Sequence, residues 1–162
     1  MKSRRSILLA LVLCVSLGCA GGRAPSPRGP SLRPVTALDA LELREPGTDW
    51  ERKSLLEADL DQDGGKDFAL LGRHKDGFVV GIVRGPVRAE SQTWTLDFPW
   101  HGGEDALCSK HAKIVLESLA ENEGPEADHP RQGLGINLSD DLCDAFHIYW
   151  SSRKQRFEWW RL

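Results

Sequence analysis

Four aspartates crowd into residues 59–67 (DLDQDGGKD), and this acidic segment limits the local fold more than any other feature of the chain. The carboxylates occupy positions 1, 3, 5 and 9 of the segment, and a glycine stands at position 6. Alternate residues of a tight loop turn their side chains toward one point, where each pair of carboxylates at about 4 Å repels by about 1–4 kcal/mol. Nearby in sequence, only Lys66 offers a compensating charge. The segment is predicted to be a cation loop, and a solvated acidic turn is the alternative.

A hard cation such as Ca²⁺ suits this loop, because it takes about six to eight oxygen ligands. Gly64 is expected to permit the sharp bend of the chain. An EF-hand is excluded, because position 12 of the loop is Leu70 and not the bidentate glutamate. The predicted cofactor is Ca²⁺, and its predicted ligands are the side chains of Asp59, Asp61, Asp63 and Asp67 and the carbonyl oxygen of Gly65.

The loop resembles the calcium loop of FG-GAP (integrin-type) and VCBS-type repeats, D-x-D-x-D-G-x-x-D followed by a short apolar strand. The four aspartates match the side-chain ligands of that family, Gly64 matches its bend, and residues 68–71 (FALL) match its strand. Gln62 stands where the family often has glycine. The resemblance covers one repeat, so it implies a structural Ca²⁺ loop on a smaller β-rich domain and not a closed propeller.

The N-terminus carries an export signal. Lys2, Arg4 and Arg5 precede an apolar run at residues 7–17, which is shorter than the roughly 20 residues of a membrane span. The run has the length of the apolar region of a signal peptide. The chain is therefore predicted to leave the cytosol.

Residues 16–19 (SLGC) resemble the lipobox of bacterial lipoprotein signals. The resemblance implies that residues 1–18 are the signal peptide and that Cys19 becomes the lipidated N-terminus, which anchors the protein to the membrane. Cleavage after Ala20 by the ordinary signal peptidase is the alternative. Because alanine and not aspartate follows Cys19, the same resemblance favours an outer-membrane lipoprotein of the bacterial envelope, facing the periplasm or the exterior.

A tether follows the signal peptide. Residues 19–34 contain four prolines and three glycines and no apolar cluster, so they are predicted to be an extended linker ahead of a single domain at residues 35–162. Without residues 1–18, the chain has 18 basic and 24 acidic residues. This balance argues against nucleic acid as a partner. The expected partners are the membrane, through the anchor, and another envelope protein or a glycan.

Short apolar runs between turn signals predict a mainly β domain with antiparallel strands. The link at residues 72–77 (GRHKDG) ends in Asp-Gly, which is typical of hairpins. Residues 104–119 are compatible with a short helix or, over 113–119, with a strand. The expected strands form a meander at 53–58, 68–71, 78–83 and 94–98, a further strand at 135–138, and a C-terminal hairpin at 145–150 and 156–161.

Two cysteines remain outside the targeting segment, Cys108 and Cys143. In an exported chain they are expected to form one disulfide, whose loop closure is worth roughly 4 kcal/mol. The alternative is a Cys₂His₂ zinc site with His111 and His147, whose spacings fit but which an oxidising compartment disfavours.

No catalytic centre is predicted, and the expected function is a structural or interaction module. The second hypothesis is an envelope hydrolase acting on peptidoglycan or polysaccharide, in which His101 shares a cleft with Glu104, Asp105 or Asp144. No nucleophile motif accompanies these residues.

Two further features of the sequence each allow more than one interpretation. An inhibitor or chaperone of another envelope protein would expose an apolar patch near Trp100 or Trp160. Asp140, Asp141 and Asp144 form either a surface turn or a second cation site.

Overall fold

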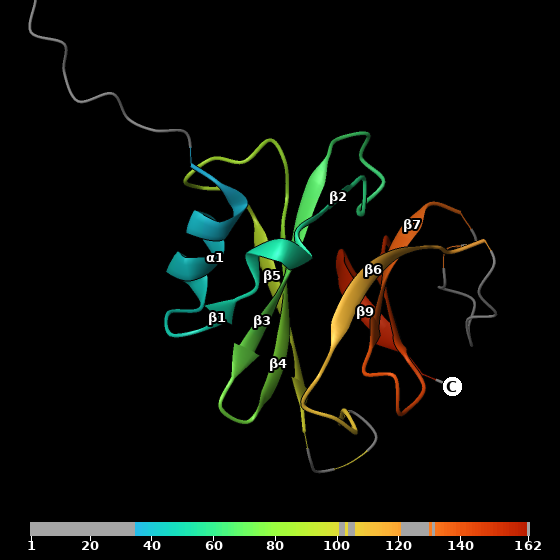
Figure 1. Cartoon of the computed structure of the whole chain (residues 1–162). Helices are drawn as coiled ribbons and strands as arrows, with labels where there is room; N and C mark the ends of the chain where they lie inside the picture. Colours follow the sequence, from blue (N-terminus) through green and yellow to red (C-terminus); the bar gives the residue numbers. More distant parts are fainter. Residues whose placement is uncertain (1–34, 101–102, 104–105, 121–129, 131, 162) are drawn as a thin grey trace, which may run out of the picture. The chain divides into compact units, whose positions relative to one another are not determined.

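Two antiparallel sheets and one short α-helix make up the described part of the fold (Figure 1). The computed structural model describes residues 35–100, 103, 106–120, 130 and 132–161. The first sheet contains β1 (Asp49–Trp50), β2 (Leu56–Ala58), β3 (Asp67–His74), β4 (Gly77–Val83) and β5 (Thr93–Pro99). The second sheet contains β6 (Lys113–Ser118), β7 (Leu134–Ser139), β8 (Phe146–Ser151) and β9 (Arg156–Trp160). These elements confirm the mainly β fold, the antiparallel meander and the C-terminal hairpin.

The only described α-helix, α1 (Ala37–Arg44), lies where no element was expected. It begins with a capping box, in which the Thr36 hydroxyl accepts from the Asp39 backbone N–H and the Asp39 carboxylate accepts from the Thr36 backbone N–H. No described helix combines the length and the apolar character that a membrane crossing needs.

Two expectations about element boundaries were wrong, and one open alternative is decided. The run at 53–58 begins as part of a 3-10 helix (Arg52–Ser54), and only Leu56–Ala58 pairs with β3. The β3–β4 link is not six residues long, because pairing continues to His74 and Gly77 and leaves only residues 75 and 76 in the turn. In the region left open at 104–119, the strand alternative holds over Lys113–Ser118.

The main core lies between the two sheets. Alternate residues of β3, β4 and β5 face alternate residues of the second sheet, as the period-two geometry of strands requires. Aromatic side chains bridge the sheets: the ring centroids of Phe98 and Phe146 are 4.8 Å apart, and those of Trp94 and Phe157 are 5.2 Å apart.

A smaller core lies on the other face of the first sheet, under α1 (Figure 1). Leu41 of α1 and Trp50 of β1 pack there over Gly81, where a Cβ atom would lie 2.6 Å from both side chains. Glycine on this strand is therefore needed for the close approach of α1. The first sheet is consequently covered on both faces, by α1 and by the second sheet.

Candidate metal centre

Three of the four loop aspartates bring their carboxylates together. Each of Asp59, Asp61 and Asp67 offers an oxygen, and these oxygens lie within 4.8 Å of one another. Asp61 and Asp67 are buried, with 7% and 1% of their surface exposed. No other group of this kind occurs in the described part of the chain. This acid cluster (Asp59, Asp61 and Asp67) is an all-oxygen site that could hold a metal ion.

Backbone N–H groups hold Asp67 in place at the start of β3. Its Oδ2 atom accepts from the N–H groups of Leu60 and Asp61, at 3.0 and 3.1 Å, and its Oδ1 atom accepts from Gly85 at 3.1 Å. The carboxylate of Asp67 therefore ties the acidic loop to itself and to the end of β4. This side chain is a structural centre of the loop in addition to a predicted ligand.

One oxygen of the acid cluster lacks a hydrogen bond. Asp59 Oδ2 accepts from the Gly64 N–H at 3.0 Å, but Asp59 Oδ1 is buried and has no partner among the described residues. A buried charged oxygen without a donor is costly. A cation bound to the cluster would remove that cost.

Arg84, at the end of β4, supplies a counter-charge that the local sequence does not reveal. Its Nε atom lies 3.0 Å from Asp61 Oδ2, and its Nη2 atom lies 2.6 Å from Asp63 Oδ2. No arginine is adjacent to the loop in sequence, and the compensating charge comes instead from Arg84, 21 residues beyond Asp63. The ammonium of Lys66 instead lies 3.7 Å from Glu57.

The pKa values of the loop aspartates move in opposite directions. Burial, followed by the charge of nearby Asp67, raises the pKa of Asp61 despite its contact with Arg84. The backbone N–H of Gly65 and the Arg84 guanidinium lower the pKa of Asp63. Asp63 is exposed and turned toward Arg84, so it stands outside the acid cluster. Its role as a ligand, like that of the Gly65 carbonyl, stays a prediction.

The loop also contacts the second sheet. Gln62 Nε2 donates to the carbonyl oxygen of Gln132 at 3.1 Å, just before β7. Beside this contact lies a polar cavity of about 620 Å³ that reaches the loop and the β8–β9 turn. Its lining includes Asp61, Gln62, Arg84, Ser152 and Gln155.

The second acidic segment is a structural turn. Asp140 is 5% exposed, and its carboxylate accepts from the backbone N–H groups of Cys108, Ser109, Leu142 and Cys143. Burial by itself raises the pKa of Asp140, but these four donors together hold it below the ordinary value. Asp141 pairs with Lys113 at 2.7 Å, and Asp144 is exposed. With its oxygens already occupied by donors, Asp140 serves the fold.

Replacing Asp140 by asparagine is expected to lower the free energy of unfolding by about 3 kcal/mol, because the amide loses charge-assisted bonds to buried N–H groups. In the wild type, the stabilisation by the ionised Asp140 carboxylate is fully present above the ordinary aspartate pKa. It is lost as the pH falls through the lowered pKa that Asp140 has in the folded protein. Denaturant titrations at several pH values measure both effects. Asp141→Asn, on the exposed neighbour, should change stability by no more than about 0.5 kcal/mol. Equal stabilities of the two variants would contradict the role given to Asp140.

The disulfide prediction is confirmed. Cys108 and Cys143 are bonded, with their Cα atoms 5.9 Å apart. The Cys₂His₂ zinc alternative is therefore wrong, because both sulfurs are consumed. His147 instead lies with its Nδ1 atom 2.9 Å from Glu117 and stacks on Trp160.

The described residues do not test the hydrolase hypothesis. His101, Glu104 and Asp105 lie outside the described residues, and Asp144 is on the surface. Trp160, expected near an exposed apolar patch, is only 7% exposed. Trp100 is half-buried against Phe78.

Comparison with protein-family models, with curated proteins and with solved structures finds no match for this chain. The FG-GAP and lipobox resemblances therefore stay predictions, and the metal centre rests on its own geometry.

Proposed function

We propose that this chain is a lipid-anchored protein of the bacterial envelope whose β domain is a calcium-stabilised interaction module. The observation that carries the proposal is the acid cluster, in which Asp59 Oδ1 is buried without a hydrogen-bond donor. The export signal, the lipobox-like residues ending at Cys19 and the disulfide are consistent with a location outside the cytosol.

Calcium fits the cluster better than zinc does. The available ligands are carboxylate and carbonyl oxygens, which a hard cation prefers, and no histidine or cysteine belongs to the cluster. Asp59, Asp61 and Asp67 would hold the ion. The Gly65 carbonyl and Asp63 would complete the set, and Asp63 would have to turn from Arg84, with which it is paired. The ion would supply the partner that the buried Asp59 Oδ1 lacks, and would add to the charge that Arg84 already places beside Asp61.

The interaction role is supported by the polar cavity beside the loop. Its lining offers amide, hydroxyl, carboxylate and guanidinium groups on one side of the metal centre. Such groups suit a hydroxyl-rich ligand such as a glycan. A bound ion would fix the loop that forms one wall of this cavity.

Calcium is expected to raise the melting temperature of the protein by about 5–10 °C. At a calcium concentration of about 10 mM and a dissociation constant of about 10⁻⁴–10⁻³ M, binding stabilises the native state by about 1.4–2.7 kcal/mol. The measurement is thermal unfolding in chelator and in calcium, with calorimetric titration of the ion. In Asp61→Asn both the calcium shift and the binding heat should be lost.

The pH dependence gives a second readout of the same test. In chelator, Asp61 has a higher pKa in the folded protein than in the unfolded chain. The free energy of unfolding of the wild type should therefore fall as the pH rises from the ordinary aspartate pKa through the raised pKa of Asp61. The Asp61→Asn variant should not show this pH-dependent loss of stability. In the wild type, bound calcium should abolish the loss. Asp76→Asn, which removes a charge from the exposed β3–β4 turn, is the matched control and should keep the full calcium response. Identical melting curves of the wild type in chelator and calcium would refute the proposal.

A further inference from the structure

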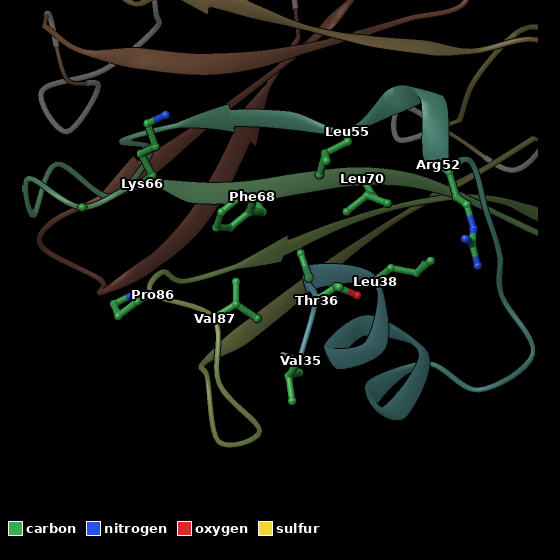
Figure 2. Close-up of a pocket in the computed structure, with 12 residues that line it drawn as sticks. Val35, Thr36, Leu38, Arg52, Leu55, Lys66, Phe68, Leu70, Pro86 and Val87 are labelled. Carbon is green, nitrogen blue, oxygen red and sulfur yellow. The ribbon is translucent and has the colours of Figure 1, made fainter. Parts of the chain in front are cut away.

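An apolar groove of about 790 Å³ lies between α1 and the edge formed by β2 and β3 (Figure 2). Figure 2 shows Phe68 and Leu70 of β3 facing Leu38 of α1 and Val87 of the β4–β5 connection across the groove. The volume lies in the range of about 300–1,000 Å³ that is typical of small-molecule sites. The groove is separate from the polar cavity and shares no lining residue with it.

The lining of this groove is apolar surface that the fold leaves partly uncovered. Leu38, Phe68 and Val87 pack against the smaller core from one side only and remain half-buried. Leu55, at the rim, is 44% exposed. Surface of this kind gains free energy when an apolar group covers it.

The charges at the two ends of the groove differ. At one end, the ammonium of Lys66 is paired with Glu57, and Figure 2 shows it pointing away from the groove. At the other end lies Arg52, which is exposed and has no ion-pair partner within the described ranges. A guanidinium without a partner at the mouth of an apolar groove favours a ligand with an anionic end.

We propose that the groove binds a single-chain anionic lipid, with its acyl chain between α1 and β3 and its head group at Arg52. The apolar lining accounts for the chain, and the position of Arg52 accounts for the head group. No metal ion takes part in this binding, although Gly65 and Lys66 of the acidic loop line one end of the groove.

The test uses two amphiphiles with the same apolar chain, dodecyl phosphate and dodecyl maltoside, below their micelle concentrations. Calorimetric titration is carried out in calcium on the full chain carrying Cys19→Ser, so that no acyl chain of its own competes. We expect dodecyl phosphate to bind about tenfold more tightly than dodecyl maltoside, because only the phosphate can pair with Arg52. Arg52→Gln should remove that preference without changing the affinity for the maltoside. Lys53→Gln, on the exposed neighbour outside the groove, is the matched control and should change neither affinity.

Leu55→Glu tests the apolar part of the groove. It places a carboxylate at the rim, and because Leu55 is already exposed the domain should keep its melting temperature while losing affinity for both amphiphiles. Val87→Trp, which fills the groove from the opposite wall, should also reduce the affinity for both amphiphiles, without adding charge. Absence of binding by dodecyl phosphate, or binding that survives both variants, would overturn the proposal. So would a dimer in sedimentation that Leu55→Glu dissociates, because a second copy would then cover the groove.

Discussion

Replacing Gly85 by alanine is expected to lower the free energy of unfolding by about 4 kcal/mol or more. Losses of this size arise when a substitution creates a buried steric clash or breaks a hydrogen-bond network. A Cβ atom on residue 85 would lie 1.8 Å from the carbonyl oxygen of Lys66, which is backbone and cannot rotate away. The same residue donates its N–H to Asp67 Oδ1. The segment that carries Gly85 must therefore move, and Asp67 loses its link to the end of β4. Denaturant unfolding measures the loss, and calorimetry should show weaker calcium binding by the same variant.

Gly47→Ala is the matched control for this substitution. Gly47 has a φ of 93°, but a Cβ atom there would have no neighbour within 4 Å, so alanine meets strain without a clash. Its expected cost is about 1–2 kcal/mol, with calcium binding unchanged. If Gly85→Ala cost no more than Gly47→Ala, the close approach to Lys66 would have no energetic importance.

Removing the disulfide with the paired substitutions Cys108→Ser and Cys143→Ser is expected to cost about 4 kcal/mol. The bond joins residues 35 positions apart, and opening it returns the corresponding loop entropy to the unfolded chain. Asp140 accepts hydrogen bonds from the N–H groups of both cysteines, so loss of the disulfide should also weaken the Asp140 turn. The total loss of stability should then be larger than about 4 kcal/mol. Equilibrium unfolding of the oxidised wild type and the double variant gives the difference.

Two comparisons make the disulfide experiment specific. The wild type in reductant should match the double variant in chemical denaturation, since both lack only the cross-link. The calcium-induced rise in melting temperature should persist in the double variant, because the acid cluster belongs to the first sheet and its loops. A double variant as stable as the oxidised wild type would show that the bond contributes nothing to folding.

The sequence predicted those parts of the fold that depend on local patterns. Alternating or continuous apolar runs located most of β3 to β5 and β7 to β9, because strand burial repeats every two residues. The disulfide followed from a count of cysteines and from the export signal. The spacing of the aspartates predicted the acid cluster, since three of them converge within one short loop.

Contacts between residues that are far apart in the sequence could not be predicted from local patterns. Arg84 pairs with Asp61 and Asp63 only because β3 and β4 form a hairpin that returns its end to the loop, 21 residues from Asp63. Asp140 looked like one of three surface acids until the disulfide turn placed four N–H groups around it. The helix α1 did have a local signal, the Thr36-x-x-Asp39 capping box, but its eight residues show too little apolar periodicity to reveal it.

The order of the strands has a consequence for how the domain acquires its structure. The first sheet is built entirely from residues before 100 and the second entirely from residues after 112, and most hydrogen-bonded neighbours are consecutive along the chain. Such local connectivity favours rapid hairpin formation within each half. If the chain is exported as proposed, the N-terminal sheet could close under α1 while Phe78, Val80 and Phe98 still face water. These three side chains would then be buried only once the second sheet, from the last fifty or so residues, has formed, so the half-folded domain is the species with the most exposed apolar surface.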